Sequence, residues 1–394
     1  MGPQVYKTPE LAPVENEVMN LVAELREQLR FRVAEKPRRW AGQLRRMAFA
    51  RAVQASNSIE GYDASIDDVV AAIDDEPTLS ADEETRLAVG GYRDAMTYVL
   101  QVAGDPQVGV DEGLLKSLHF MMIKHRLDKN PGRWRPGAVY VRHEPTGEIA
   151  YEGPPSDRVQ ELIAATINEL EASDAPVLVR AAMAHLNLVM VHPFSDGNGR
   201  MARCLQTLTL AREQIVAPVF SSIEEYLGRN TQAYYDILAK VGQGQWNPDG
   251  DARPWVRFCL TAHYHQARTQ VRRIEETERL YLECCELADK HGLPERAAGG
   301  LGDAALGLRL RRPSYQAVVK ATHAEEISDL TASRDLRAIV EAGLFKPVGQ
   351  ARGRYYLAEP PLKEIHDGIR ADRAPRETAD PFELALGQLR LDVA

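Results

Sequence analysis

The most constraining feature of this sequence is residues 192–203, which read HPFSDGNGRMAR. Pro193 and Gly197 do not fit inside a helix, whereas the chain from Met201 onward has a helical pattern, so a turn should open into a helix here. The first amides of such a helix are free, and the positive end of its dipole attracts anions. Because Gly197 and Gly199 let the backbone approach an oxygen atom closely, this run predicts a site for a nucleotide phosphate.

The polar side chains of this run suit chemistry on a phosphate. Arg200 and Arg203 lie three residues apart, so they project from one helix face, and each offers a fork of N–H donors to phosphate oxygens. Asp196 has no cation beside it in the sequence, which predicts a bound Mg²⁺ shared with the phosphates. His192 titrates near neutral pH and is therefore the expected general base.

The whole run matches the signature of the Fic family, H-x-F-x-(D/E)-G-N-G-R-x-x-R, at every specified position. A match of this length is far more specific than a single glycine-rich triplet. A plain Gly/Asn turn with a buried histidine and two surface arginines would not explain both the paired glycines and the arginine spacing. The resemblance implies a mainly α fold, the Fic helical bundle with a β-hairpin flap, and an enzyme that moves AMP from ATP to a protein hydroxyl.

Carried over to this sequence, the resemblance implies a role for each residue of the run. Asp196 would hold Mg²⁺ between the α- and β-phosphates of ATP, and His192 would remove the proton from a Ser, Thr or Tyr hydroxyl of an unidentified target protein. That hydroxyl would attack the α-phosphorus, and preorganised donors would stabilise the transition state. The remaining phosphate contacts fall to Asn198, to the backbone near Gly197 and Gly199, and to Arg200 and Arg203.

Residues 56–61, SNSIEG, resemble the inhibitory motif of some Fic proteins, (S/T)-x-x-x-E-(G/N), which lies on a helix before the core. The resemblance implies that Glu60 pairs with Arg203, with Ser56 and Gly61 completing the motif. A carboxylate there would occupy the place of the γ-phosphate and turn the α-phosphate away from attack. The alternative is a helix end with Gly61 as its C-cap; beside the signature, the inhibitory interpretation is favoured.

Residues 132–155 contain the only convincing β pattern before the C-terminal region. A strand with Val139, Tyr140 and Val141 precedes a turn over 144–148 and a second strand over 149–151, which predicts a hairpin. In Fic proteins a hairpin at this place, the flap, pairs with an extended segment of the target. Backbone pairing tolerates varied side chains, so the flap does not reveal the target. The alternative is an ordinary edge hairpin that covers the core.

Residues 230–235, NTQAYY, resemble the family segment N-R-x-x-Y-Y, whose tyrosines help to enclose the adenine. Tyr234 and Tyr235 are the matching positions, and aromatic faces suit a flat base. Thr231 and Gln232 depart from the commoner residues, which puts the contacts in doubt. Paired tyrosines are as often part of a helix core, so both interpretations stay open.

The chain of 394 residues is too long for one compact core, so several domains are expected. Ser80 to Glu83 fits a capping box that begins a helix running toward Val102. Residues 297–302, AAGGLG, fit a flexible joint. The predicted division is an N-terminal helical region with the inhibitory motif (1–110), the Fic core (111–275), a helix and linker (276–302), a winged-helix domain (303–358), and a peripheral tail with one short helix (359–394).

The pattern beyond residue 302 resembles a winged helix, an α+β module that many bacterial Fic proteins carry at this end. Short helices are predicted over 314–322 and 324–330, and Thr331 can N-cap a third helix that Gly343 closes. Two strands around residues 349–353 should follow.

Winged helices bind DNA or serve as docking or dimerising units, so DNA and a second copy of the chain are both candidate partners. In DNA-binding versions the third helix, here with Arg334 and Arg337, enters the major groove, and a wing with Arg352 and Arg354 contacts phosphates. Asp335 and Glu341 dilute this positive charge.

The composition, 44% hydrophobic and 27% charged, is that of an ordinary soluble protein, and the net charge of −9 argues against coating nucleic acid with the whole chain. No run approaches the roughly 20 apolar residues that span a bilayer, and the start lacks the apolar core of a signal peptide, so no membrane partner is expected. The four cysteines form no C-x-x-C pair. Reduced thiols and a cytoplasmic location are therefore expected.

Three other functions stay open at this level. A phosphotransferase of the Doc type would carry a lysine in place of the second glycine, and Gly199 argues against it. In an AMP-removing hydrolase, Glu60 would activate water instead of blocking ATP. In a nucleotide-sensing regulator, the residues beyond 302 would bind DNA and the chain would have no modification activity.

Overall fold

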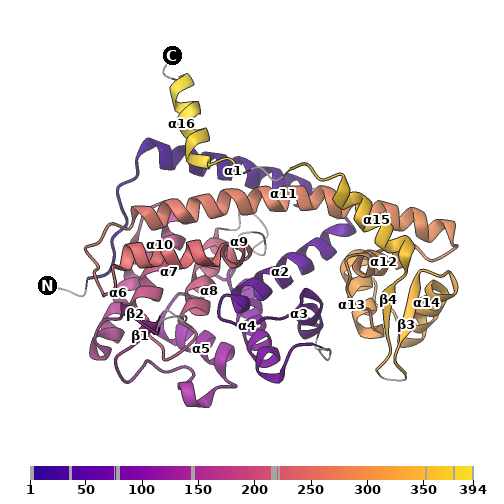
Figure 1. Ribbon diagram of the computed structural model, residues 1–394, viewed down its shortest axis with the longest axis horizontal. Coiled ribbons are helices and arrows are strands. Elements are labelled where there is room, and N and C mark those ends of the chain that lie inside the picture. The colour runs from indigo at the N-terminus through magenta and orange to yellow at the C-terminus, as the bar shows by residue number, and fades with distance from the viewer. Residues whose placement is uncertain are drawn as a thin grey trace.

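The computed structural model describes residues 4–34, 38–74, 76, 80–142, 147–213, 220, 222–350, 353–375 and 378–392. This described part is almost entirely helical, with two short antiparallel hairpins (Figure 1), which confirms the expected fold class. Within these ranges, no helix combines the length and the apolar character that a membrane span requires.

Two helices in the middle of the N-terminal part carry the predicted phosphate site. They are α7 (Val177–Val191) and α8 (Asn198–Arg212), and the signature run forms the turn between them. Residues 205–210 are buried and α8 has almost no exposed face, which is typical of a helix enclosed by its neighbours. Around this pair pack α4 (Glu83–Val102), α5 (Glu112–Ile123) and, after the short turns η1 (Leu127–Lys129) and η2 (Ser156–Arg158), α6 (Val159–Ala172).

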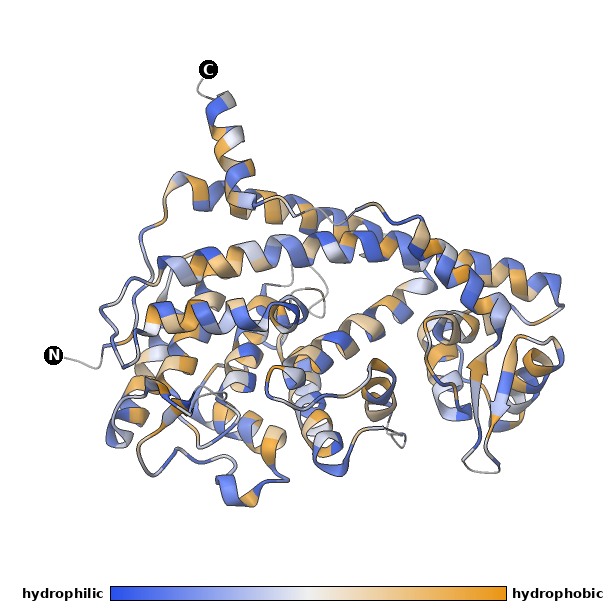
Figure 2. Ribbon diagram, viewed as in Figure 1, coloured by the Kyte–Doolittle hydropathy of each residue, from blue (hydrophilic) through white to orange (hydrophobic). Residues whose placement is uncertain are grey.

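A long helix, α11 (Arg253–Lys290), runs along one side of the whole molecule, and α1 (Pro13–Ala34) lies beside it (Figure 1). Hydrophobic and hydrophilic bands alternate along α11 (Figure 2), as expected for a helix with one buried face. The predicted boundary between residues 275 and 276 lies inside this continuous helix. The remaining helices on this side are α9 (Glu224–Arg229), α10 (Thr231–Gly242) and α16 (Pro381–Asp392), which packs on α1.

The expected inhibitory motif lies at the end of α2 (Trp40–Ser58), and α3 (Ile66–Ile73) follows it. The capping box predicted for α4 is wrong in one respect. Asp82, not Ser80, is the N-cap, because its side chain accepts a bond of 2.7 Å from the Thr85 amide. Ser80 is drawn away from the helix, since its backbone N–H and its hydroxyl both donate to Asp68.

The predicted flap hairpin is present as β1 (Tyr140–Arg142) and β2 (Ile149–Glu152), which pair antiparallel with Val141 opposite Tyr151. Residues 144–146 of the predicted turn lie outside the described residues. The Tyr151 hydroxyl donates to the Met190 carbonyl at 2.7 Å, so β2 is anchored to the end of α7, two residues before His192.

The C-terminal part contains three helices and then a hairpin, but the helices differ from the predicted ones. The short helix predicted over 324–330 is wrong, because Ala324 has a left-handed φ of 52° that ends the helix over 312–323, and the next helix begins only at Asp329. Ser328, not Thr331, caps that next helix by accepting from the Thr331 amide. The elements are α12 (Ala297–Ala305), α13 (Arg312–His323), α14 (Asp329–Glu341), β3 (Phe345–Val348) and β4 (Tyr355–Ala358).

The flexible joint predicted over residues 297–302 is instead the buried start of α12. Its glycines are needed for close packing: a Cβ on Gly299 would lie 2.8 Å from Val318, and one on Gly300 would lie 2.8 Å from the ring of Tyr315. The small side chains let α12 approach α13. Composition alone does not distinguish this use of glycine from chain flexibility.

The tail is also less peripheral than predicted, because α15 (Pro360–Ala371) packs on α11 and α12 and buries Leu362 and Ile369. In α14, Arg334 and Arg337 are exposed. Asp335 does not dilute their charge as expected, because it is buried and accepts two bonds from Arg296 at 2.7 and 3.0 Å. Arg352 lies outside the described residues.

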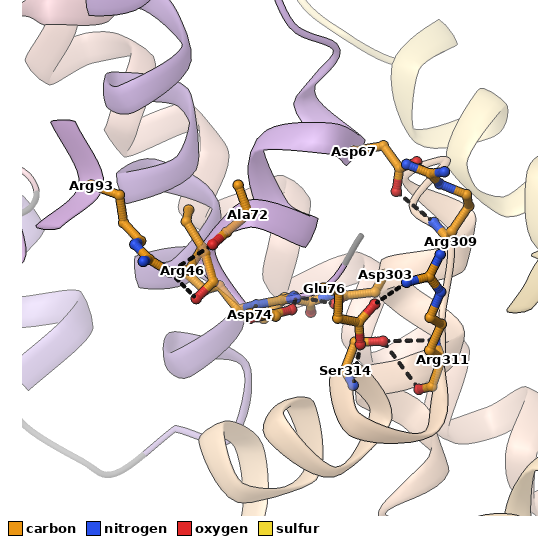
Figure 3. Close-up of polar contacts among 12 residues, drawn as sticks. Arg46, Asp67, Ala72, Asp74, Glu76, Arg93, Asp303, Arg309, Arg311 and Ser314 are labelled. Atoms are coloured by element: carbon orange, nitrogen blue, oxygen red, sulfur yellow. Dashed lines mark hydrogen bonds and ion pairs between the residues drawn. The ribbon is translucent and has the colours of Figure 1, made fainter. Parts of the chain in front are cut away.

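A buried polar network joins α2 and α3 to the C-terminal part (Figure 3). Arg46 pairs with Asp74 and, at 2.5 Å, with Asp303 of α12. Arg309, before α13, pairs with both Asp67 and Asp68 of α3. These contacts fix α2 against the C-terminal part and thereby help to position the inhibitory motif.

Candidate active site

The turn between α7 and α8 has two left-handed residues. His192 ends α7 with a φ of 51°, and its amide donates to the Leu188 carbonyl at 3.0 Å. Gly197 precedes α8 with a φ of 74°, a conformation that glycine adopts without strain. The turn therefore brings the imidazole and the first turn of α8 next to each other.

The start of α8 offers unpaired donors to a ligand. Within the described part of the chain, the amides of residues 198–200 donate to no acceptor. Arg200 is buried, and its Nε and Nη1 have no hydrogen-bond partner there, while its guanidinium lies 5.1 Å from the centre of the Tyr62 ring. Nη1 of Arg203 is likewise buried without a partner. Unpaired buried cations cost stability, so this arrangement indicates an anion-binding site.

Residues 56–61, the predicted inhibitory motif, lie at the end of α2 and contact Arg203. Glu60 accepts a bond of 2.7 Å from Nη2 of Arg203, and the buried Ser56 hydroxyl accepts one of 2.7 Å from Nε of the same arginine. Gly61 has a φ of 81°. The two interpretations of this motif therefore coexist, because the chain leaves the helix at Gly61 and its glutamate also pairs with Arg203.

The carboxylate of Glu60 lies over the first turn of α8. A Cβ built on Gly199 would lie 2.3 Å from Oε1 of Glu60, so only a glycine leaves room for the carboxylate. Burial, the largest single influence, raises the pKa of Glu60, but the charges of Arg203 and Arg200 outweigh it and hold the pKa below its usual value. Glu60 is thus a carboxylate that occupies an anion site.

His192 is arranged to act as a base. Its Nδ1 lies 3.1 Å from the Val189 carbonyl oxygen, which can only accept, so Nδ1 carries the proton and Nε2 has a free lone pair. Burial is the largest influence on the ring and lowers the pKa of His192 below its usual value. The imidazole is therefore neutral at pH 7 and able to accept a proton.

Asp196 is the residue that fits a metal. One carboxylate oxygen accepts from the Gly197 amide at 2.6 Å, and the other has no hydrogen-bond partner among the described residues. No group of three His, Cys, Asp or Glu side chains within the described ranges is placed to hold a metal by itself. A single free carboxylate oxygen beside a phosphate site fits Mg²⁺, which takes most of its other ligands from phosphates and water.

Asn198 holds the turn in shape. Its side-chain oxygen accepts from the Phe194 amide at 2.9 Å, and its nitrogen donates to the Phe194 carbonyl at 2.9 Å. One of the two N–H donors of its amide is used in this way, and the second remains for a ligand. The predicted contact of Asn198 with a phosphate oxygen therefore stays a prediction.

The tyrosine pair of α10 is divided between the core and the surface. Tyr234 is buried with its hydroxyl 3.0 Å from Nε2 of His185, which agrees with the alternative interpretation as helix core. Tyr235 is 45% exposed, and its hydroxyl donates to the Ile59 carbonyl at 2.8 Å, next to Glu60. Of the two rings, only that of Tyr235 has a surface that a base can stack on.

The flap lies beside the imidazole. A Cβ on Gly153, which follows β2, would lie 2.7 Å from Val139 and 3.8 Å from Cβ of His192. Tyr140 and Val141 are exposed, and among the described strands β1 pairs only with β2. The outer edge of β1 is therefore available for pairing with an extended segment.

Two positioning residues were not predicted. The buried Arg135 donates from Nε to the His192 carbonyl at 2.8 Å and from Nη1 to the Gly137 carbonyl at 2.6 Å, which ties the catalytic turn to the flap. Nothing in the local sequence distinguishes it from Arg133 two residues earlier.

His119 of α5 supports the other side of the turn. Its Nδ1 accepts from the Gly132 amide at 2.8 Å, so Nε2 carries the proton and donates to the Asp196 carbonyl at 3.0 Å. The ring stacks on Phe194 with centroids 3.7 Å apart, and burial lowers the pKa of His119 to about 4. A lone histidine in an apolar helix gives no sequence signal of this role.

Comparison with known proteins matches the part of the chain that contains this turn. Residues 109–210 match the model of the Fic/DOC family. The chain is 26% identical over 219 residues to "Protein adenylyltransferase Fic" of Nematostella vectensis, a match that covers 54% of this chain and 46% of that protein. It is 29% identical over 189 residues to the protein of the same name from Aedes aegypti, covering 44% of this chain and 34% of that one. The chain thus aligns with less than half of the length of each of these relatives.

A solved structure extends the likeness to the whole chain. The crystal structure of a Fic family protein from Desulfovibrio desulfuricans G20 matches with a TM-score of 0.57, covering 90% of this chain and 99% of that one. The sequence identity of this pair is 23%, so the match establishes the fold alone.

Proposed function

Because residues 109–210 form a Fic domain, we propose that this chain transfers AMP from ATP to a Ser, Thr or Tyr hydroxyl of a target protein and releases pyrophosphate. The single observation that carries the proposal is the start of α8, where free amides and two buried arginines with unpaired N–H groups adjoin a neutral imidazole. A triphosphate satisfies those donors, and a hydroxyl satisfies the free Nε2.

The reaction follows from these groups. The triphosphate binds to the amides of residues 198–200 and to the guanidinium groups of Arg200 and Arg203. His192 Nε2 accepts the proton of the target hydroxyl, whose oxygen attacks the α-phosphorus, and the bond from that phosphorus to pyrophosphate breaks. Asp196 would hold Mg²⁺, which when bound neutralises charge on the phosphates. The amides and arginines, fixed before the reaction, stabilise the charge that gathers on the phosphate oxygens.

We also propose that Glu60 inhibits this activity. The support is its bond of 2.7 Å to Arg203 and its position over Gly199, since a carboxylate there competes with the terminal phosphate for the same donors. With that phosphate displaced, the α-phosphorus is turned away from His192. The flap then selects the acceptor. Two observations support this: the outer edge of β1 is free among the described strands, and Gly153, which follows β2, lies beside His192.

The test is incorporation of label from α-³²P-ATP into cell lysate and into the protein itself. Wild type, Glu60→Gly and the double variant Glu60→Gly/His192→Ala are compared, with Glu24→Gly, an exposed change in α1, as the matched control. Glu60→Gly should label more strongly than wild type and Glu24→Gly. The added His192→Ala should reduce labelling by about 10²–10⁴-fold, the contribution of a general base.

Labelling that persists in the double variant would refute the assignment of His192. Equal labelling by wild type and Glu60→Gly would refute inhibition by Glu60 but leave transfer intact. Loss of AMP from a prelabelled protein on incubation with wild type, together with no incorporation by any variant, would establish the hydrolase instead.

A further inference from the structure

A second cationic site lies outside the signature run. A cavity of about 520 Å³ is enclosed by α2, α11, α15 and the residues that follow α15. Neither Glu60 nor any residue of the run 192–203 lines it. Its volume is within the usual range for sites that bind small molecules.

The wall of this cavity is strongly cationic, although the whole chain carries a net charge of −9. Among the described residues that line it, one acidic side chain, Glu276, faces six arginines and His366. The arginines come from four separate elements or their ends: Arg51, Arg229, Arg272, Arg273, Arg370 and Arg373. Like charges brought together in this way repel each other, so the arrangement costs stability unless an anion joins it.

Two carboxylates balance part of this charge. Glu225 pairs with both Arg273 and Arg229. Glu276 accepts two bonds of 2.7 Å from Arg373 and lies 3.4 Å from Arg272. Among the described residues that line the cavity, cationic side chains therefore still outnumber acidic ones.

The other two arginines form no salt bridge with a carboxylate of the described residues, although the charges of Glu225 and Glu276 act on Arg51. Arg51 and Arg370 make no hydrogen bond or ion pair of their side chains with any described residue. Arg51 is partly buried in the middle of α2, and burial followed by the repulsion of Arg273 lowers the pKa of Arg51 to about 10. Their donors are available to a ligand in the cavity.

The lining also includes apolar side chains, among them Leu44, Met47, Leu280 and Ile369. We infer that this cavity binds a small molecule that carries at least two phosphate groups and an apolar or planar body. The guanidinium groups suit phosphate oxygens because they bind them with paired N–H donors. A membrane surface or a nucleic-acid duplex does not fit into a cavity of this volume.

The position of the site gives the ligand a structural effect. Arg51 lies on α2, Arg272 and Arg273 lie on α11, and Arg370 lies on α15, so one polyanion binds three elements together. A ligand that binds only the folded chain stabilises it. Binding should therefore raise the melting temperature of the protein whether or not the protein transfers AMP.

Isothermal titration calorimetry and thermal melting of the full chain with inorganic tripolyphosphate test the inference. The variants are Arg51→Gln/Arg370→Gln in the cavity, Arg200→Gln at the start of α8, and Arg334→Gln/Arg337→Gln as a control that removes two exposed charges from α14. The cavity variant should bind tripolyphosphate about tenfold more weakly or worse and lose the rise in melting temperature. The Arg334→Gln/Arg337→Gln control should bind it as wild type does. Arg200→Gln, which removes a donor of the α8 site, should keep binding at the cavity and the rise in melting temperature.

Three results would overturn the inference: no binding to wild type, unchanged binding by the cavity variant, or loss of binding in Arg200→Gln alone. The single change Arg370→Gln, at an exposed position, serves if the double variant does not fold, and it should weaken binding by about threefold or more. Because the readout is binding, failure of this site and failure of AMP transfer are separate outcomes.

Discussion

Buried charges occur in two regions around α2, and the two regions differ in whether the charged groups have hydrogen-bond partners. At the start of α8, Arg200 leaves two buried N–H groups without a partner among the described residues, and Arg203 leaves one. Between α2 and the C-terminal part, Arg46 is bonded by both Asp74 and Asp303, and Gln43 donates to the same Asp303 at 2.7 Å (Figure 3).

This difference separates a site from an architectural joint. A buried network with its partners in place makes a contact rigid, whereas a buried donor without a partner is a cost that folding alone does not explain. Glu60 belongs to the first region, where it satisfies part of Arg203 and remains 22% exposed. The helix α2 is thus held strongly near Arg46 and more weakly at its end, next to Glu60.

The largest expected effect is on stability and concerns Arg46, which lies in the region with paired charges. Arg46→Met removes the cation that Asp74 and the buried Asp303 share, so the free energy of unfolding should fall by about 3–5 kcal/mol in urea denaturation. Arg334→Met, at an exposed position of α14, is the matched control and should change it by about 0.5 kcal/mol or less. A loss below about 1 kcal/mol for Arg46→Met would show that the joint is not structural.

At Arg200, loss of the charge is not expected to lower the free energy of unfolding. Arg200→Met removes a buried charge and leaves no hydrogen-bond acceptor of the described residues without its donor. The free energy of unfolding should therefore stay unchanged or rise by about 1 kcal/mol. In the Glu60→Gly background the same change should weaken ATP binding by about tenfold or more, measured by calorimetry. Strong destabilisation with unchanged ATP binding would mean that Arg200 is an architectural residue after all.

A smaller effect, on AMP transfer, is expected at the end of α2 next to Glu60. Tyr235→Phe removes the hydrogen bond of 2.8 Å to the Ile59 carbonyl beside Glu60, a loss of about 0.5–1.5 kcal/mol. Because this bond helps to hold Glu60 in place, labelling from α-³²P-ATP should rise a few-fold without Glu60 being changed. Tyr140→Phe, on the exposed flap strand, is the control for loss of a tyrosine hydroxyl. Labelling by Tyr235→Phe at or below the wild-type level would show that this hydrogen bond has no part in inhibition.

The smallest effect concerns the titration of His192. Its lowered pKa means that the ring stays neutral as pH falls below 6.5, the usual value, and gains a proton only at lower pH. Glu60 favours the charged ring, so Glu60→Gln should lower the pKa of His192 further and extend the neutral range to more acidic pH. NMR titration of labelled histidine in the two proteins measures the shift. A midpoint above 6.5, or an upward shift in the variant, would contradict this account of the site.

Much of the site was predictable because its residues are close in the chain. The run 192–203 contains the proposed base, the carboxylate proposed to hold a metal, both glycines and both arginines, and local geometry alone requires a turn that opens into a helix there. The helices around it were predictable from their periodicity, and the hairpin from its two strands and turn. The resemblance of residues 56–61 to an inhibitory motif likewise pointed to the pairing of Glu60 with Arg203.

Other features depended on tertiary contacts that no local pattern contains. The sequence gives no signal of the two bonds between the Asn198 side chain and the Phe194 backbone, and residues 297–302 look flexible until α13 packs against their glycines. Arg135 and His119 are ordinary residues in the sequence and gain their roles from partners far along the chain. The arginine-lined cavity has the same origin, because its charges come from segments that only folding brings together. Local sequence determines dihedral preferences and the order of side chains, whereas burial and pairing between distant segments are properties of the folded chain alone.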